Sequence, residues 1–318
     1  MIEAESLSKR YGPLTAVDNI SFKAEKGDVL GFLGPNGAGK TTTMRIITGF
    51  MPPSEGRATV AGMDVFEKSR EVKSRIGYLP ERPPLYQDMV VRTYLDYVAE
   101  LKGLNRSQRG EAVERVVESC GIGEVADRLA GHLSKGYQQR LGIAQAMVND
   151  PEVLILDEPT IGLDPKQIVE MRDMIRKLAG ERTVILSSHI LGEVSRICNK
   201  VVIINRGKIV ANDTIEALKK SLQSTERVTM RLQKGDPSVG DAVEKLPGVK
   251  SVSKSGGTWN IESEPGSGTV ENVAQLVIDK GWGLEEVSHV DISLEDVFLQ
   301  LVRESEDERE AGLQEGEE

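Results

Sequence analysis

The sequence contains few cysteines and few aromatic residues. Two of its 318 residues are cysteine, and Phe, Trp and Tyr together make up 4%. This composition excludes a small secreted scaffold held by several disulfides. Cys120 and Cys198 both lie in helix-like apolar surroundings and lack the spacing of metal ligands. We therefore expect two ordinary thiols in a reduced, cytosolic compartment.

Long hydrophobic runs are also missing. The longest aliphatic runs, such as residues 201–204, have the length of a strand. A membrane-spanning helix needs about 18 or more consecutive apolar residues. Residues 1–5 carry neither the basic region nor the apolar core of a signal peptide. The sequence therefore predicts a protein that has no spanning helix of its own.

Positive charge is scarce relative to negative charge, and the excess is local. The net charge is −10. Residues 304–318 hold eight acids and one arginine, which leaves −3 for the rest of the chain. That remainder has no basic stripe, so we expect no nucleic-acid partner. The tail at 304–318 is polar and free of aromatic residues, which predicts a disordered segment with a solubilising or an interaction role.

Short aliphatic runs alternate with helical patterns over residues 1 to about 220. The runs lie at 29–33, 153–156, 183–187 and 201–204. This arrangement is typical of an α/β fold with a mostly parallel sheet covered by helices on both faces. Between about 90 and 148 the apolar residues recur at helical spacing instead. We expect a helical subdomain inserted into the sheet there.

The pattern changes after about residue 222. Strand-like and helix-like segments follow one another as β-α-β-β-α-β, the ferredoxin-like order. Ser293 then resembles the cap of a helix over 294–302. We predict a small accessory α+β domain over 222–303, with a regulatory or dimerising role and no catalytic constellation.

The most informative segment is the glycine-rich run at 34–41. Its residues are Gly34, Pro35, Asn36, Gly37, Ala38, Gly39, Lys40 and Thr41, which fill the template G-x-x-x-x-G-K-[ST]. Glycines allow the backbone to turn its N–H groups toward phosphates. Lys40 supplies a cation for the β- and γ-phosphates, and the Thr41 hydroxyl can bind Mg²⁺. A strand before the run and a helix after it give the setting that a nucleotide phosphate site requires.

Two acids end the second aliphatic run. Asp157 closes the strand at 153–156, and Glu158 follows it. Beside a phosphate loop, Asp157 is expected to lie near Mg²⁺, and Glu158 can act as general base on the attacking water.

Two further segments carry groups suited to anion chemistry. Ser134 and Gly136 begin a helix, where a hydroxyl and backbone N–H groups can bind a phosphate; Ser134 is alternatively a simple N-cap. His189 follows the strand at 183–187. A lone histidine is usually structural, but this placement favours a functional role.

Taken in order, these segments resemble the nucleotide-binding subunit of an ATP-binding-cassette (ABC) transporter. The resemblance covers residues 1 to about 220. The family signature Leu-Ser-Gly-Gly-Gln appears here as Leu-Ser-Lys-Gly-Tyr, with Lys135 and Tyr137 as departures. This variant is similar to bacterial exporter ATPases of the drug-export, copper-maturation and gliding-motility groups. Residues 161–165 resemble the D-loop, which communicates across the dimer of such proteins.

The resemblance implies roles for individual residues. Tyr11 would stack on adenine, and a core tyrosine is the alternative. His189 would contact the γ-phosphate and the attacking water, with Glu158 and Lys40 as the other catalytic residues. ATP would be bound by Tyr11, Gly34, Pro35, Asn36, Gly37, Ala38, Gly39, Lys40, Thr41, Thr42, Ser134 and Gly136.

Glu81 is a third departure. The segment at 76–81 aligns with the Q-loop, where the family usually has Gln to bind Mg²⁺ and to link to the membrane partner. A carboxylate also binds Mg²⁺, but it adds a negative charge. The expected metal ligands are therefore Thr41, Glu81 and Asp157.

The resemblance implies an ATPase subunit that powers a separate membrane permease, as an exporter at the cytoplasmic membrane face. Two copies would pair head to tail around ATP. An alternative is a soluble ABC protein acting as a mechanical module in translation or DNA repair, although this chain lacks a second cassette, heptads and a basic face. A P-loop kinase is a third possibility, and Ser134, Gly136 and His189 argue against it.

Overall fold

The computed structural model describes residues 1–180, 182–222, 226–234, 238–290 and 293–302. The acidic tail at 304–318, which we predicted to be disordered, lies outside the described residues. The chain divides into two compact units. Unit 1 comprises Met1–Ile215 together with the described residues 298–302, and unit 2 comprises Glu216–Val297. The division falls a few residues before the boundary near 220 that we expected.

A six-stranded sheet forms the centre of unit 1. Its order is β10-β9-β3-β8-β7-β6, and every neighbouring pair is parallel except β9 and β10. The strands are β3 (Val29–Leu33), β6 (Ile76–Leu79), β7 (Val153–Asp157), β8 (Thr183–Ser188), β9 (Lys200–Asn205) and β10 (Lys208–Thr214). The predicted mostly parallel α/β sheet is confirmed.

A second sheet of unit 1 was not predicted. It is antiparallel, with the order β2-β1-β4-β5. Its strands are β1 (Ile2–Tyr11), β2 (Leu14–Ala24), β4 (Glu55–Val60) and β5 (Met63–Asp64). Its inner face joins the core of the central sheet, where the rings of Phe22 and Phe32 pack with centroids 5.3 Å apart. Burial of such aromatic area is a main stabilising contribution of a core.

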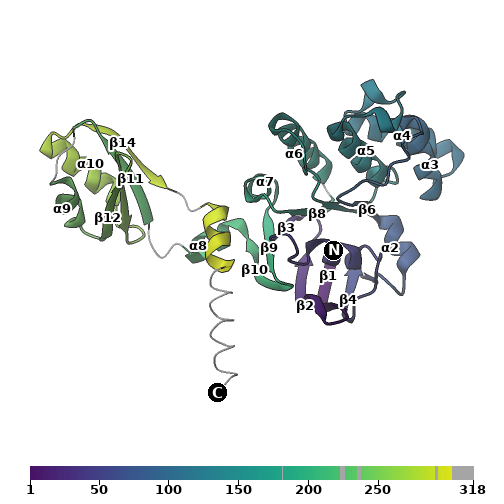
Figure 1. Ribbon diagram of the computed structural model, residues 1–318, viewed down its shortest axis with the longest axis horizontal. Helices are drawn as coiled ribbons and strands as arrows, with labels where there is room; N and C mark the ends of the chain where they lie inside the picture. The colour runs from purple at the N-terminus through teal and green to yellow at the C-terminus, as the bar shows by residue number, and fades with distance from the viewer. Residues whose placement is uncertain (181, 223–225, 235–237, 291–292, 303–318) are drawn as a thin grey trace, which may run out of the picture. The chain divides into compact units, whose positions relative to one another are not determined.

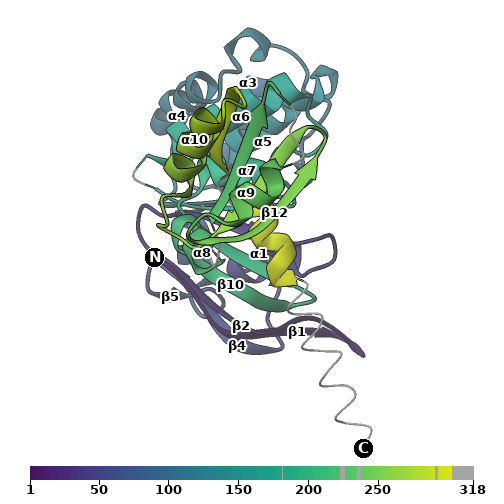
Figure 2. The same ribbon diagram turned by 90° about the vertical axis from the view of Figure 1, so that its left-hand side faces the viewer.

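Helices flank the sheets and form a separate group at one end. Close to the sheets lie α1 (Lys40–Ile47), α2 (Ser69–Arg75), α6 (Pro165–Ala179) and α7 (Leu191–Ile197). The group at 90–148 consists of α3 (Val91–Leu101), α4 (Arg106–Ser119) and α5 (Lys135–Met147). Figures 1 and 2 both show α3, α4 and α5 at the opposite end of unit 1 from β1, β2 and β4.

The register of the central strands brings three loops together. Leu33 at the end of β3 pairs with Ser188 of β8, and Asp157 at the end of β7 pairs with Ser187. The loops after β3, β7 and β8 therefore leave the sheet side by side at its carboxyl edge. Ligands of open α/β sheets bind at such an edge.

Unit 2 has a small core of its own. Its elements follow the order β11 (Glu226–Leu232), α9 (Val239–Glu244), β12 (Val249–Ser255), β13 (Thr258–Ser263), α10 (Thr269–Lys280) and β14 (Leu284–Val290). The antiparallel sheet has the order β12-β13-β11-β14, so the predicted ferredoxin-like order is confirmed. Helix α8 (Ile215–Leu222) precedes it. The predicted cap is also present, since the Asp296 N–H donates to Ser293 Oγ at 3.2 Å.

Among the described residues, no helix is both long enough and apolar enough to cross a membrane. The bounds 222–303 that we gave for the accessory α+β domain, and its accessory role, stay predictions.

Candidate functional site

The loop between β3 and α1 has a backbone that suits glycine. Gly37 and Gly39 have φ angles of 81° and 110°, in the left-handed region that side chains disfavour. A Cβ at Gly39 would also lie 2.6 Å from the Ala16 carbonyl oxygen. Gly39 is the residue before the first turn of α1. The loop thus delivers the chain to a helix N-terminus, where backbone N–H groups favour an anion.

Lys40 lies buried at the base of this loop. Its ammonium donates to the carbonyl oxygens of Gly34 at 2.7 Å and Pro35 at 3.3 Å. It also forms an ion pair of 3.3 Å with Glu158 Oε1, and only 6% and 8% of the two side chains are exposed. The loop after β3 and the loop after β7 are joined by this contact.

Glu158 also joins the loop after β8. Its Oε2 lies 2.8 Å from His189 Nδ1. An ionised carboxylate can only accept, so in this contact Nδ1 carries the proton. The Glu158 N–H donates to Ser187 Oγ at 3.1 Å, which fixes the backbone beside the carboxylate. One carboxylate therefore contacts both the predicted lysine and the predicted histidine.

Asp157 is fully buried next to this cluster. Ser187 Oγ donates to Asp157 Oδ1 at 2.5 Å. Burial raises the pKa of Asp157, and the neighbouring hydroxyls of Ser187 and Thr41 oppose that increase. The negative charges of Glu158 and Glu81 raise the pKa further. Asp157, Thr41 and Glu81 are thus close enough to influence one another.

These residues suit a divalent cation that is shared with a substrate. Asp157 Oδ2 is buried and has no hydrogen-bond partner among the described residues, so a carboxylate oxygen is left for a ligand. No group of three or more His, Cys, Asp or Glu in the described chain has the arrangement of a metal centre. Mg²⁺ needs no such group, because it usually binds one or two carboxylates, water and substrate phosphates.

Tyr11 lies apart from the cluster, at the end of β1. The residue is 44% exposed, and its hydroxyl donates to Met51 Sδ at 3.1 Å. The Lys9 ammonium lies 5.6 Å from the ring centroid. Tyr11 is therefore not a core residue, and its exposed ring can accept a stacked partner.

Ser134 and Gly136 also lie apart from the cluster. Ser134 caps α5 by accepting from the Tyr137 N–H at 3.5 Å. A Cβ at Gly136 would meet Gln167 Oε1 at 2.9 Å. The side chain of Lys135 packs against Gly162 of the predicted D-loop, and the φ of 68° at Gly162 suits glycine. Among the described residues, no hydrogen bond or ion pair joins Ser134 or Gly136 to Lys40.

Sequence reasoning missed two residues beside the cluster. Thr160 Oγ1 donates to Glu193 Oε2 at 2.6 Å, and both residues are buried. The one signal for them in the sequence is their short spacing from predicted site residues. Thr160 follows Glu158 by two residues, and Glu193 follows His189 by four. The spacing alone does not reveal that the two side chains meet.

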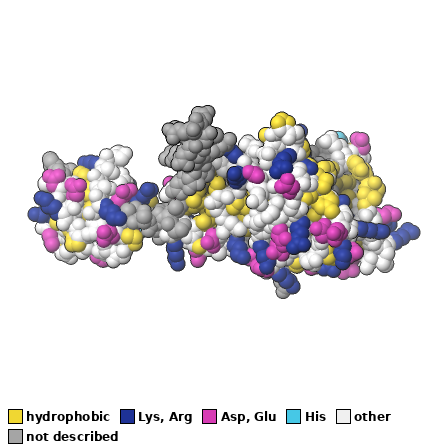
Figure 3. All heavy atoms as spheres, turned by 90° about the horizontal axis from the view of Figure 1, so that it is seen from below, with side chains coloured by type: hydrophobic (Ala, Val, Ile, Leu, Met, Phe, Trp, Pro, Cys, Tyr) yellow, Lys and Arg dark blue, Asp and Glu magenta, His cyan; other side chains and the backbone are white. Residues whose placement is uncertain are grey.

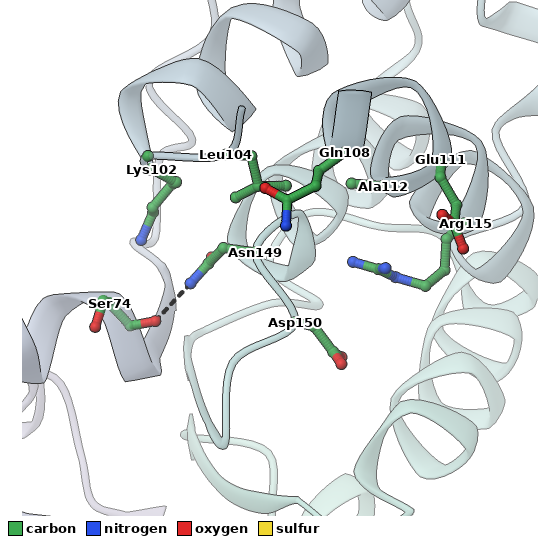
Figure 4. Close-up of a pocket in the computed structure, with 10 residues that line it drawn as sticks. Ser74, Lys102, Leu104, Gln108, Glu111, Ala112, Arg115, Asn149 and Asp150 are labelled. Carbon is green, nitrogen blue, oxygen red and sulfur yellow. Dashed lines mark hydrogen bonds between the residues drawn. The ribbon is translucent and has the colours of Figure 1, made fainter. Parts of the chain in front are cut away.

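A polar hollow lies away from this site, between α3, α4 and the segment before β7. It has a volume of about 470 Å³ (Figure 4). Lys102 and Arg115 both line it, but each donates to a backbone carbonyl, that of Ile76 and that of Val148 respectively. Asn149 bonds the Ser74 carbonyl at 2.7 Å. These contacts tie α3, α4 and the core together, and no residue of the predicted nucleotide site lines the hollow.

The comparisons with known proteins agree with one another. The family model described as ABC transporter matches residues 17–161. The bacitracin transport ATP-binding protein BcrA of Bacillus licheniformis is 40% identical over 222 residues, covering 69% of this chain and 72% of that protein. The uncharacterized ABC transporter ATP-binding protein YhcH of Bacillus subtilis is 35% identical over 311 residues, covering 97% and 98%. The daunorubicin resistance ATP-binding protein DrrA2 of Streptomyces coeruleorubidus is 32% identical over 328 residues, covering 98% and 97%.

Solved structures give the same fold. An ATP-binding subunit of an ABC transporter matches with a TM-score of 0.64 and 26% identity, covering 70% of this chain and 92% of that one. The dimeric, post-hydrolysis cassette MJ0796 bound to ADP and Pi matches with a TM-score of 0.62 and 20% identity, covering 68% and 99%. The matched share corresponds to the size of unit 1.

Proposed function

Because the chain belongs to the ABC transporter family, as an ATP-binding and ATP-hydrolysing subunit, we propose that Glu158, His189 and Lys40 carry its hydrolysis reaction. The observation that supports this most is the Glu158 carboxylate, which lies 3.3 Å from Lys40 Nζ and 2.8 Å from His189 Nδ1. A base, a cation and a histidine thus meet at the end of the phosphate loop.

In this proposal each residue has one task. Lys40 neutralises the β- and γ-phosphates, and Glu158 accepts the proton of the attacking water. His189 donates from Nδ1 to Glu158. In the neutral ring Nε2 can then accept a hydrogen bond from the attacking water, and in the imidazolium form Nε2 can donate to the γ-phosphate. The backbone N–H groups of the loop at 34–41 bind the remaining phosphate oxygens together with Thr42. Tyr11 stacks on the adenine.

Mg²⁺ would be held by Thr41, Asp157 and Glu81. Its contribution when bound is to neutralise charge that builds up on the phosphates. Burial and a free Oδ2 make Asp157 suited to this role. Ser187 orients the other oxygen of the same carboxylate.

Two chains would pair head to tail, with each ATP between Lys40 of one chain and Ser134 and Gly136 of the other. Support for this proposal comes from the dimeric cassette MJ0796, a solved structure to which this chain is similar in fold. The γ-phosphate joins the chains before hydrolysis and is lost afterwards, so it can switch the pairing.

The permease partner would dock beside β6. A groove of about 690 Å³ there is lined by apolar residues, including Phe50 and Leu101, and by the cations Arg70 and Lys73. Phe50 and Leu101 are 71% and 66% exposed. Large exposed apolar side chains of this kind mark interaction sites. Strand β6 leads to Glu81, so the groove and the metal site share one segment.

We place the protein at the cytoplasmic membrane face as an exporter subunit. The relatives named for bacitracin transport and daunorubicin resistance support export of an antibiotic-like compound. They disfavour a soluble module for translation or DNA repair. Acidic and basic side chains are also interspersed on the face that Figure 3 shows, with no continuous basic stripe on it.

The experiment that tests the proposed roles is the ATPase rate of Glu158→Gln. The amide cannot accept a proton, so we expect kcat to fall by about 100-fold or more while ATP still binds. Glu152→Gln is the matched control, since Glu152 lies at the other end of β7 and pairs with Arg75 on the surface. Wild-type turnover in Glu158→Gln would show that Glu158 is not the base.

A further inference from the structure

The loops after β7 and β8 are joined by two side-chain contacts rather than one. The first contact is Glu158 with His189 at 2.8 Å. The second is Thr160 with Glu193 at 2.6 Å. Each contact joins the segment after β7 to the segment after β8, which comprises the loop with His189 and the first turn of α7. Two contacts constrain the orientation of one segment against the other more than a single contact would.

The Thr160–Glu193 contact is more buried than the Glu158–His189 contact. Thr160 and Glu193 are 4% and 8% exposed, whereas 40% of the His189 side chain is exposed. Water competes with a hydrogen bond at an exposed position and does so much less at a buried one. Burial raises the pKa of Glu193, the hydrogen bond from Thr160 opposes that increase, and the charge of Glu158 adds to it. A buried acid of this kind is costly without its partner, so the pair holds together.

Thr160 also lies in a tight turn that begins at Glu158. The Ile161 N–H donates to the Glu158 carbonyl at 3.2 Å, so residues 158–161 form one tight turn. Glu158 has a φ of 51°, in the left-handed region. Such a conformation in a residue other than glycine is strained and persists only where neighbouring contacts enforce it. The hydrogen bond from Thr160 to Glu193 is one of the contacts that hold Glu158 in this backbone conformation.

Glu193 acts on the histidine side in the same way. It lies in the first turn of α7, four residues after His189, and its N–H donates to the Ile190 carbonyl at 3.2 Å. Holding Glu193 therefore holds the start of α7 and the short loop before it, which contains His189.

We propose that Thr160 and Glu193 are a positioning pair that sets the Glu158–His189 geometry for ATP hydrolysis. Neither residue touches the nucleotide in this proposal, which rests on the proposed roles of Glu158 and His189. Misplacing a reacting group by about 1 Å can cost about 100-fold in rate. Loss of the pair is therefore expected to lower kcat while ATP affinity changes little.

The test compares disruptive and conservative variants in the full-length protein. Thr160→Val keeps the shape but loses the hydroxyl, and Glu193→Ala loses the acceptor. We expect each to lower kcat by about 10- to 100-fold, with KM within about threefold of wild type. Thr160→Ser and Glu193→Gln keep a donor and an acceptor, and they should retain at least about one third of kcat. The double variant Thr160→Val/Glu193→Ala should lose no more than the worse single variant.

Thr183→Val is the matched control. Thr183 is fully buried at the opposite end of β8, and its hydroxyl donates to the Glu25 carbonyl at 3.0 Å. The Thr183→Val variant loses the same type of hydrogen bond as Thr160→Val, but at a position far from the carboxyl edge of the sheet. We expect a lower Tm with kcat near wild type, which separates a loss of stability from a loss of positioning.

A second readout needs no turnover. The chain has three histidines, so the ring nitrogens of His189 can be assigned by ¹⁵N NMR in the protein without nucleotide. Wild type should show a proton on Nδ1, and Thr160→Val should shift the His189 signals toward tautomer averaging. The Thr183→Val spectrum should match wild type at His189.

Two results would overturn the inference. One is a wild-type kcat and an unchanged His189 spectrum in Thr160→Val. The other is an equal loss of kcat in Thr160→Ser and Thr160→Val. If instead Glu158→Gln turns over normally, the proposed catalytic role itself fails, so the two failures can be told apart.

Discussion

Lys40 is the residue on which nucleotide binding depends most directly. Its buried ammonium is held by two loop carbonyls and by Glu158. Hydrogen bonds to charged groups contribute about 1.5–3 kcal/mol each, so Lys40→Ala should weaken ATP binding by at least about tenfold. Titration with a fluorescent ATP analogue measures this. Lys26→Ala, at an exposed position, is the control, and equal affinities of the two variants would remove Lys40 from the phosphate site.

Glu81 gives a prediction that concerns the metal. Replacing its carboxylate by the usual amide removes one negative charge near Asp157, worth at least about 1 kcal/mol at contact distance, or roughly fivefold. Glu81→Gln should therefore keep ATPase activity and need roughly fivefold more Mg²⁺ for the half-maximal rate, and Glu81→Ala should lose more. Identical Mg²⁺ titrations for wild type and both variants would make Glu81 a solvated loop residue.

At the residue scale, a local motif was enough to predict which side chains lie near the phosphate loop. Lys40, Glu158 and His189 each come after a buried strand and Asp157 ends one, and the parallel order brings these segments together. The Thr160–Glu193 contact could not be predicted, because it depends on the distance between two loops. A threonine and a glutamate have many other local uses in a sequence.

Asp164 has a place both in the predicted D-loop and at the N-terminus of helix α6. Asp164, part of the predicted D-loop, caps α6 by accepting from the Gln167 N–H at 2.9 Å, and Pro165 occupies the first turn. Pro at this position suits a helix start. The D-loop thus ends where α6 begins.

Loss of this cap should lower stability by a measurable amount. Asp164→Ala should cost about 1 kcal/mol, which is about 2–4 °C in Tm for a unit of this size. Asp164→Asn keeps an acceptor and should lose much less. Calorimetry measures both variants, and an unchanged Tm in Asp164→Ala would show that the cap contributes nothing.

At the element scale, the sequence predicted the short buried strands of the parallel sheet, but not strands whose pairing is interrupted by bulges. The parallel strands β3, β7, β8 and β9 are short buried runs that need no alternation. Strand β1 alternates, but its pairing with β2 shifts register at three points, and Ser6 has a φ of 48°. Bulges of this kind break the two-residue period on which strand prediction depends.

Among the described residues, one hydrophobic cluster lies in unit 1 and another in unit 2, and the two have no residue in common. The cluster in unit 1 uses residues between 1 and 209, and that in unit 2 uses residues between 228 and 287. A chain cut after residue 222 should therefore remain folded and bind ATP, since every predicted site residue precedes the cut. An insoluble product would show that the C-terminal part completes the core of unit 1.

The permease partner is tested by copurification from membranes. Wild type should bring down an integral membrane protein. Phe50→Glu should reduce that yield, because it places a charge in the groove beside β6. Ile278→Glu is the control, at a residue that is also exposed but lies on α10 of unit 2. Equal recovery with wild type and Phe50→Glu would place the permease elsewhere on the surface.

The central claim is that ATP is bound between two copies of this chain, and trapping the dimer tests it most directly. With ATP and Mg²⁺, Glu158→Gln should elute in size-exclusion chromatography with light scattering at twice the chain mass of 34.8 kDa. Adding Ser134→Ala and Gly136→Asp to that variant should return it to a monomer that still binds ATP. A Glu158→Gln protein that binds ATP yet stays monomeric would contradict the account.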